Sequence, residues 1–333
     1  MKVLSFGYKL AALAASCLFA CGGPSGSPPP TGSTLVTGTG AGAVTGRVLE
    51  TVSRRPVSGA LVETSGGTAR TDASGAFQVP SNGGTLAVTI TASGHVTRRS
   101  FLGAMQPSPT LDVIETGSLW NLDFYRELAR DGAGGGNLKA LNPWTVEPRF
   151  YIDRSPETGS GRSIPDGSAS AVEAAIGAVV PLLTTSRFSG SQVESGTTPP
   201  SDLTPGTVVI RWDPVEVSRT AGAASGITRG VGGNASVVVL RSIEETGVIY
   251  HELGHVLGLY HPLGGRRPSL MSGSGTSIPP FFTDWDVFHA NVLYARPPGN
   301  TDVDNDPQGF VAGASPLKAE TVSTAVAVCV FPR

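Results

Sequence analysis

The sequence is poor in charge, in cysteine and in histidine. Of its 333 residues, 15% are charged, the net charge is −2, three are cysteine and five are histidine. So low a charge leaves no basic footprint for nucleic acid, and we expect no nucleic-acid partner. Glycine and proline are frequent instead, at 44 and 26 residues. This composition favours β-rich modules, loops and linkers over a helical bundle, and the length allows two modest domains.

A targeting segment opens the chain. Lys2 and Lys9 precede an apolar run from Leu10 to Ala20, which is too short to span a bilayer as a mature anchor. The run ends in Leu-Phe-Ala-Cys at residues 18–21, which resembles a bacterial lipobox. We therefore predict a signal peptide over residues 1–20 and lipidation of Cys21. The exported protein would be anchored in the outer membrane or at the cell surface. A plain secretory signal, giving a secreted protein, is the alternative.

Export of this kind would leave one unmodified cysteine in the mature protein. Cys17 would be removed and Cys21 lipidated, so Cys329 would stand alone and no intrachain disulfide could form. The Gly/Ser/Pro-rich residues 21–41 have nothing to bury, and we expect a tether that holds the folded part away from the membrane.

Residues 42–115 alternate short apolar strands with turns. The turn at Asp72-Ala73-Ser74-Gly75 suits an aspartate that bonds its own backbone and a glycine with positive φ. The segment resembles the carboxypeptidase regulatory-like domain, which implies a small transthyretin-like β-sandwich of accessory or spacer role and leaves Asp72 and His95 as turn residues. The matching residues are VTGRV (44–48), PVSGALVE (56–63), TDASGAFQV (71–79) and ASGH (92–95), and the expected strands are 44–48, 60–63, 76–79 and 86–91.

Three of the five histidines fall within the stretch HELGHVLGLYH, residues 251–261. His251 and His255 are four residues apart, so on a helix they face one metal ion together, with Glu252 beside them. Gly258 suits a left-handed residue that ends the helix and turns the chain back. That turn would let His261 complete three nitrogen ligands and leave the fourth zinc position open, as catalysis requires.

The flanking residues also favour a helix. Ser242 and Glu245 form a possible capping box, and Ile249, Leu253 and Val256 form an apolar stripe largely opposite the imidazoles. A core helix with incidental histidines is the alternative. It leaves the HExxHxxGxxH spacing unexplained, so we favour a catalytic Zn²⁺ site with ligands His251, His255 and His261.

The motif and the residues after it resemble the metzincin metallopeptidases, whose signature is this motif followed by a methionine turn. Met271 follows the third histidine closely, and HELGHVLGLYH is most similar to matrixin-type members. The resemblance implies that Met271 forms a hydrophobic floor under the imidazoles and that Gly258 supports the turn. It also implies that Glu252 is the general base that activates a zinc-bound water.

Two features depart from relatives of this kind. Astacin- and serralysin-type members carry a tyrosine two residues after the methionine, where this chain has Gly273. No cysteine lies between Cys21 and Cys329, so a matrixin-type cysteine switch of the usual placement is not expected.

Residues 116–298 change to an α/β pattern that agrees with a metzincin-like catalytic domain, a mixed twisted sheet with three main helices. Strands are expected at 150–152, 208–212 and 236–240. One helix is expected to be capped by Ser170 and Glu173, and a last one by Thr283 and Asp286. The resemblance implies that Ala235–Leu240 is the sheet edge that aligns an extended substrate. Gly230-Val231-Gly232-Gly233 would let substrate approach, or form a surface loop. His289 is expected to be a packed or surface histidine rather than a fourth ligand.

Residues 299–333 form a C-terminal extension of open role. Asp302-Val303-Asp304-Asn305-Asp306 resembles the start of a calcium loop, but Pro307 stands where an EF-hand needs glycine. An apolar β-like run follows at residues 322–331. The predicted fold class is thus α+β, with a β-sandwich (42–115) and a zinc peptidase domain (116–298). These two parts are expected to fold separately.

The sequence predicts a zinc metalloendopeptidase that acts on proteins or peptides and contacts the membrane through its lipid anchor. A non-catalytic zinc-bearing surface lipoprotein and a zinc hydrolase of non-peptide substrates are the alternatives. Retention of Glu252 argues against the first of these, because a structural zinc does not need that carboxylate.

Overall fold

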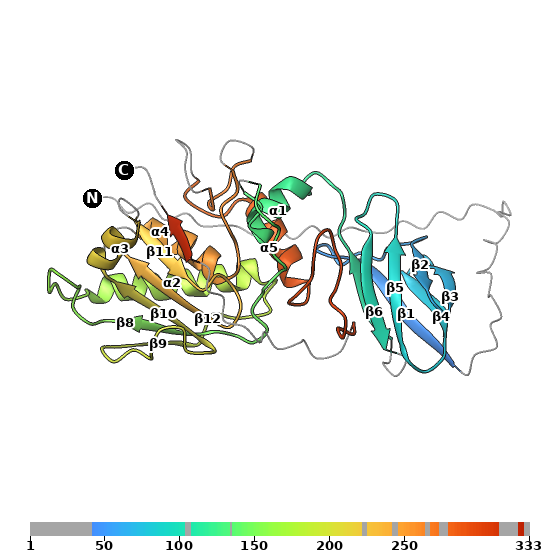
Figure 1. Ribbon diagram of the computed structural model, residues 1–333, viewed down its shortest axis with the longest axis horizontal. Helices are drawn as coiled ribbons and strands as arrows, with labels where there is room; N and C mark the ends of the chain where they lie inside the picture. The colour runs from blue at the N-terminus through green and yellow to red at the C-terminus, as the bar shows by residue number, and fades with distance from the viewer. Residues whose placement is uncertain are drawn as a thin grey trace, which may run out of the picture. The chain divides into compact units, whose positions relative to one another are not determined.

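A computed structural model describes residues 42–103, 108–133, 135–221, 225–241, 246–263, 267–272, 279–312 and 326–329 (Figure 1). The predicted signal peptide, lipidation site and tether therefore lie outside the described residues, as do Ser242, Glu245 and Gly273. The predictions made for them remain predictions.

Residues 42–113 form two β-sheets that share one hydrophobic core. The first sheet has the order β4-β1-β7 and the second the order β3-β2-β5-β6. Alternate residues of β1, from Val44 to Val48, are buried, as expected for strands with one face on a core. The strands are β1 (Gly42–Glu50), β2 (Leu61–Thr64), β3 (Gly67–Arg70), β4 (Ala76–Ser81), β5 (Thr85–Thr91), β6 (Arg98–Gly103) and β7 (Thr110–Val113).

A sheet of six described strands forms the second half, in the order β13-β11-β12-β10-β8-β9. Its central strands are parallel, whereas β11 runs antiparallel to both β12 and β13. The bounds are β8 (Arg149–Asp153), β9 (Val193–Gly196), β10 (Thr207–Trp212), β11 (Gly226–Arg229), β12 (Ala235–Leu240) and β13 (Val326–Cys329). The prediction that Ala235–Leu240 is the sheet edge is wrong, because β12 pairs with β10 on one side and β11 on the other.

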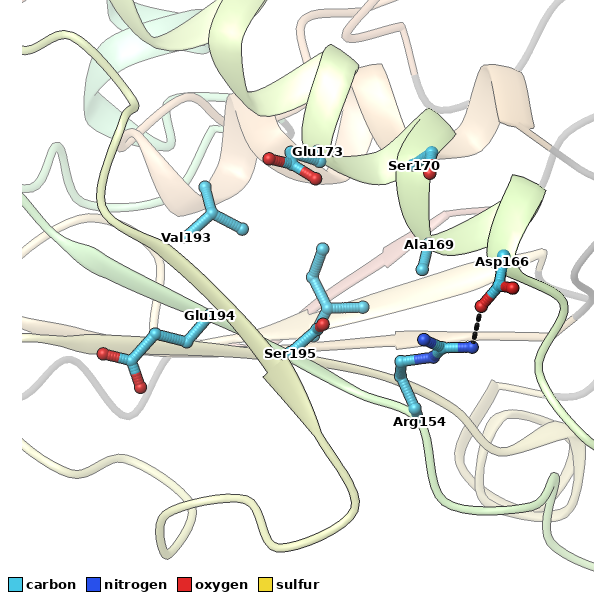
Figure 2. A pocket seen from close by; sticks show the side chains of 9 residues that line it. Arg154, Asp166, Ala169, Ser170, Glu173, Val193, Glu194 and Ser195 are labelled. Atoms are coloured by element: carbon cyan, nitrogen blue, oxygen red, sulfur yellow. Dashed lines mark hydrogen bonds and ion pairs between the residues drawn. The ribbon is translucent and has the colours of Figure 1, made fainter.

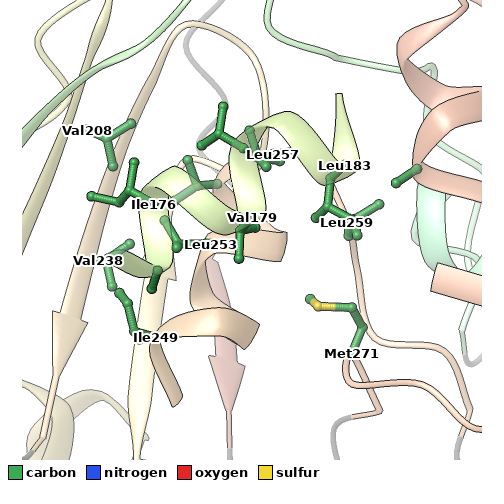
Figure 3. Close-up of a cluster of buried hydrophobic side chains, with 14 of the residues drawn as sticks. Ile176, Val179, Leu183, Val208, Val238, Ile249, Leu253, Leu257, Leu259 and Met271 are labelled. Carbon is green, nitrogen blue, oxygen red and sulfur yellow. The ribbon is translucent and has the colours of Figure 1, made fainter. Parts of the chain in front are cut away.

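The described part contains five α-helices, so the fold is mixed α+β as predicted. They are α1 (Leu122–Arg130), α2 (Asp166–Leu183), α3 (Pro214–Ala221), α4 (Thr246–Val256) and α5 (Asp284–Tyr294). α2 is long and apolar enough to cross a membrane by length and composition alone. Its apolar face instead joins α4 and the sheet in one core, where Ile176 and Val179 lie near Leu253 and Val238 (Figure 3).

The predicted start of α5 is confirmed and that of α2 is not. Thr283 and Asp286 form the capping box predicted for α5. The prediction for α2 was wrong, because this helix begins at Asp166, before Ser170, and Pro165 caps it without a side-chain hydrogen bond. The fixed φ of a proline suits a helix start, and this start extends the helix by a turn.

A buried ionic network joins the strands of the first half to the segment after α5. Arg296 Nη1 lies 2.6 Å from Asp112 Oδ2, and Arg296 Nε lies 2.6 Å from Asp304 Oδ1. Arg98 Nη1 reaches the other oxygen of Asp112 at 2.5 Å, and its Nη2 lies 2.8 Å from Asp306 Oδ2. Burial alone would raise the pKa of Asp112, but the charges of Arg296 and Arg98 outweigh it and hold that pKa well below its ordinary value.

The residues that resembled a calcium loop belong to this network. Asp304 and Asp306 face arginines, as above, and Asp302 accepts two hydrogen bonds from Arg126 at 3.1 and 2.7 Å. Their charge is thus balanced by guanidinium groups, and no carboxylate of the three is left to a cation. The backbone of the same segment bonds to β6, where Arg99 N donates to Asp304 O and Asp306 N donates to Arg99 O.

Candidate metal centre

Helix α4 presents His251 and His255 on one face, and the chain after it returns His261 to the same point. The Nε2 atoms of the three imidazoles lie 3.1, 3.1 and 3.0 Å apart. A tetrahedral zinc ion with Zn–N bonds of about 2.0–2.1 Å would separate its nitrogen ligands by about 3.3 Å. The predicted cluster is therefore present, at a spacing close to that of a zinc site.

Backbone carbonyls fix which nitrogen of each helical imidazole points inward. His251 Nδ1 lies 2.7 Å from Leu270 O, and His255 Nδ1 lies 2.6 Å from Leu259 O. A carbonyl can only accept, so each Nδ1 carries the proton and each Nε2 presents a lone pair. Two acceptors cannot hydrogen-bond to each other. The converging Nε2 atoms therefore fit a cation, and an Nδ1 that donates to a backbone carbonyl is typical of a metal-binding histidine.

Burial keeps these imidazoles neutral. It lowers the pKa of His251 to about 3 and that of His261 to about 4, and it lowers the pKa of His255 as well. Zinc needs the neutral ring, because protonation occupies the ligand lone pair. The site is thus ready for a metal at neutral pH without first losing a proton.

The turn that carries His261 forms as predicted and is braced from a second helix. Gly258 has φ +98°, a conformation that favours glycine, and Leu259 N donates to Gly254 O as the helix closes. Tyr260 N then donates to Leu128 O at 2.6 Å, in α1. Leu263 N donates to Glu127 Oε2 at 3.0 Å. Sequence analysis missed α1 as the support of the third histidine.

The glycine-rich segment before β12 neither lines an open approach nor forms a surface loop. Gly232 N donates to His255 O at 3.1 Å, and Gly233 N donates to Asn142 O at 2.7 Å. A Cβ at Gly232 would lie 2.4 Å from Asn142 O. Trp144 Nε1 also donates to Val256 O at 2.7 Å. Both alternatives for this segment were wrong, because it packs against the C-terminal end of α4.

Met271 is fully buried and packs against α4 at Gly254, which has no side chain. A Cβ at Gly254 would lie 2.4 Å from Met271 Sδ, so only glycine lets the thioether pack against the helix backbone between His251 and His255. Figure 3 shows Met271 below the group formed by Leu253, Leu257 and Leu259. This placement fits the floor that the metzincin resemblance implied.

Asp286 holds the turn of Met271 and was recognised in the sequence only as a helix cap. Its buried carboxylate accepts from Ser269 Oγ at 2.5 Å and from Leu270 N at 3.0 Å, besides the capping bond from Thr283 N at 2.9 Å. Leu270 is the residue whose carbonyl holds His251. The capping pattern predicted that Asp286 lies in the first turn of α5. No local pattern indicated its hydrogen bonds to Ser269 and Leu270.

Glu252 is buried against strand β11. Its Oε2 accepts a hydrogen bond from Thr228 Oγ1 at 2.5 Å. A Cβ at Gly226 would lie 2.5 Å from Glu252 Oε1, so the strand passes directly beside the carboxylate. His251, Glu252 and His255 have no exposed surface, and His261 is half-buried.

His289 lies apart from the three histidines. Its Nδ1 donates to Trp285 O at 2.8 Å and its Nε2 faces Asn121 N at 3.4 Å, so both ring nitrogens are engaged. Trp120 and Trp285 stack on the ring. His289 is thus a packed histidine, as expected. Asp72 bonds Ser74 N and Ala76 N, which makes it a turn residue.

A separate polar cavity of about 220 Å³ lies between the start of α2 and strands β8 and β9 (Figure 2). Arg154 and Asp166 form an ion pair at its rim, and Glu173 and Glu194 bring further negative charge. None of its lining residues belongs to the histidine cluster. The mixed charges select no one class of ligand.

Comparison with known families agrees with the geometry of the histidine site. The family described as Astacin (Peptidase family M12A) matches residues 210–265, which contain α3, β11, β12, α4 and all of HELGHVLGLYH. The match supports a zinc metallopeptidase. It covers only this part of the chain, and a search of curated proteins found no match.

Solved structures add little. A chain of an N-terminal interface mutant of the type II cohesin–X-dockerin complex from Acetivibrio cellulolyticus is 26% identical, with a TM-score of 0.17, over 21% of this chain and 51% of that one. The GH20 exo-β-N-acetylglucosaminidase from Vibrio harveyi is 9% identical, with a TM-score of 0.21, over 63% of this chain and 31% of that one. The chain spans about half or less of either protein, and both scores are too low to carry an argument.

Proposed function

We propose that the protein is a zinc-dependent endopeptidase. The observation that carries the proposal is the convergence of three imidazole Nε2 atoms, within 3.1 Å of one another, with Glu252 adjacent to the first ligand on the same helix. The match of residues 210–265 to a metallopeptidase family supports it. A protein or peptide would be the substrate.

Each residue has a role that its contacts suggest. His251, His255 and His261 would hold the ion. Zinc, when bound, lowers the pKa of water and polarises a carbonyl oxygen. The Glu252 carboxylate would take a proton from the attacking water and return it to the leaving amine. Thr228 orients that carboxylate through its hydroxyl, and Met271 and Asp286 keep the helix and the imidazoles in place.

Two other functions share the zinc site but use it differently. A non-catalytic zinc-bearing binding protein would need the three imidazoles and not the carboxylate that Thr228 orients. A hydrolase of non-peptide substrates would use the same four residues. We favour the peptidase hypothesis because the family that matches the site is a peptidase family.

The proposal is tested by loading the purified chain with zinc and digesting a library of peptides whose products are identified by mass spectrometry. Internal cleavage that stops when a chelator removes zinc, and resumes when zinc is restored, is the expected result. Zinc binding without cleavage of any peptide would favour the binding protein, and cleavage of esters or amides alone would favour the other hydrolase.

We also propose that the protein is exported and lipid-anchored through Cys21. The proposal rests on the order of three features in residues 2–21: two lysines, an apolar run, and a lipobox-like end at Cys21. A folded peptidase on a tether of about twenty residues would then meet its substrates at the membrane surface.

A further inference from the structure

Strand β11 is the part of the sheet nearest the catalytic carboxylate. Thr228 bonds Glu252, and Gly226 leaves no room for a side chain between the strand and the same carboxylate. One edge of β11 is taken by β12. An extended peptide that adds to the sheet beside Glu252 can therefore use only the other edge of β11.

That edge is paired with the chain's own C-terminal segment. β13 runs antiparallel to β11 along its whole length, from Gly226 opposite Cys329 to Arg229 opposite Val326 (Figure 1). The main-chain groups that would align a substrate strand are thus engaged by residues 326–329. Because a strand edge offers one row of these groups, a second strand cannot pair with it at the same time.

Three of the four residues of the proposed site are fully buried in the same arrangement. Glu252, His251 and His255 have no exposed surface. A general base has to reach the water whose proton it takes, and in the described state the edge of β11 is filled and the carboxylate is covered.

We propose that β13 is an intramolecular occupant of the substrate-binding edge and that the C-terminal segment must leave β11 before a substrate can bind. This inference rests on the proposed peptidase function. Four paired residues form a short strand, and short strands pair weakly, so displacement by a substrate is feasible. Tethering gives the segment a high effective concentration, which makes it a competitor even when its own affinity is low.

A shortened chain tests the competition. The zinc-loaded chain of residues 22–333 is compared with the same chain ending at Thr324, which lacks β13. We expect kcat/KM for an internally quenched peptide to rise by about tenfold or more, mainly through KM, because the binding-competent fraction increases. A labelled peptide of residues 322–333 should bind the shortened chain in fluorescence anisotropy and inhibit it competitively, and a scrambled peptide should do neither.

A reversible crosslink tests the same point without removing residues. Arg229 and Val326 are opposite in the antiparallel register, at a separation that a disulfide spans. In a Cys329→Ser background, Arg229→Cys with Val326→Cys should lose most activity when oxidised and regain it with a thiol reductant. Each single cysteine variant is the matched control and should not respond.

The outcomes separate the two proposals. Equal kcat/KM for the two chain lengths, or an oxidised crosslink that stays active, would show that β13 is a permanent structural strand and overturn the inference, with the peptidase intact. If the shortened chain fails to fold, the crosslinked variant decides alone. All zinc-loaded forms could be inactive while the labelled peptide still binds only the shortened chain. That result would contradict the proposed peptidase function but not the proposal that β13 occupies the edge of β11.

Discussion

Leu270 is hydrogen-bonded through its amide to Asp286, with Leu270 N donating to Asp286 Oδ2 at 3.0 Å. The carbonyl of the same residue accepts from His251 Nδ1 at 2.7 Å. A single residue thus connects a buried carboxylate on α5 with a proposed metal ligand on α4. The orientation of the first imidazole depends on this connection.

Replacing Asp286 with alanine should therefore weaken zinc binding. Loss of the carboxylate releases Ser269 and Leu270, and losing a group that orients a metal ligand costs about 10–100-fold in metal affinity. Competition with a chelating indicator measures the change. Asp284→Ala, an exposed aspartate in the same first turn, is the control and should bind zinc as the parent does. Equal affinity in both variants would show that Asp286 is only a helix cap.

The network around Arg296 should contribute strongly to stability. Arg296→Ala leaves Asp304 buried without its arginine and Asp112 with Arg98 alone, and breaking a buried pair in this way costs about 3–5 kcal/mol of the free energy of unfolding. Arg55→Ala removes an exposed guanidinium from its pair with Glu50 and should cost much less, because solvent screens the arginine. Urea unfolding of both variants checks the difference. Similar small losses would mean that the network is not a stabilising connection.

This network also bears on whether the two halves fold separately. A chain that begins at Gly117 would lack Asp112 and Arg98, and so leave Arg296, Asp304 and Asp306 without those partners. We expect it to be markedly less stable than the full chain, contrary to the composition-based prediction of independent folding. The midpoint of urea unfolding for the two chains, at equal zinc content, tests this. A shared midpoint would support independent folding.

Stability should fall in acid partly through His289. Burial lowers the pKa of this ring to about 4, below the value of about 6.5 in an unfolded chain. The neutral ring therefore stabilises the fold above pH 6.5, and this contribution is lost as the pH falls towards 4, on the order of 3 kcal/mol. His289→Phe removes the titration. Its stability relative to the parent should improve as the pH is lowered from 7 to 4, and an unchanged difference would contradict the assignment.

Lipid anchoring predicts a simple change in partitioning. The parent chain, expressed with its N-terminal segment in a bacterium, should enter the detergent phase with acyl groups on Cys21. Cys21→Ser should move to the aqueous phase, because the proposed acyl chains are attached to the thiol of this residue. Mass spectrometry of the mature N-terminus distinguishes the two forms. An unmodified parent that begins at another residue would favour the plain secretory signal.

The sequence predicted the site better than its surroundings. The spacing of His251, His255 and His261 reflects helix geometry and a tight turn, and both are local, so three nitrogens could be brought together from eleven residues alone. Buried strands such as β10 and β12 were also visible as apolar runs. Their pairing order was not, because β11 has only four residues and no distinctive pattern.

Contacts between residues far apart in the chain could not be predicted from local sequence patterns. Asp302, Asp304 and Asp306 resembled a cation loop because acidic spacing looks alike whether a metal or an arginine faces it. The partners Arg98 and Arg296 come from other parts of the chain. The supports of His261 from α1, and of Met271 from Asp286, were missed for the same reason: they depend on tertiary packing rather than on neighbours in sequence.

A change at Glu252 separates zinc binding from proton transfer. Glu252→Gln keeps the shape of the side chain and all three imidazoles but loses basicity. Zinc per chain should stay near that of the parent, and turnover of a cleaved peptide should fall by about 10² or more. Glu147→Gln changes a carboxylate that accepts hydrogen bonds from Ser189 and Gly190; it is the control and should keep full turnover. Parent-like hydrolysis by Glu252→Gln at equal zinc content would contradict the mechanism, and hydrolysis by a zinc-free parent would contradict the function.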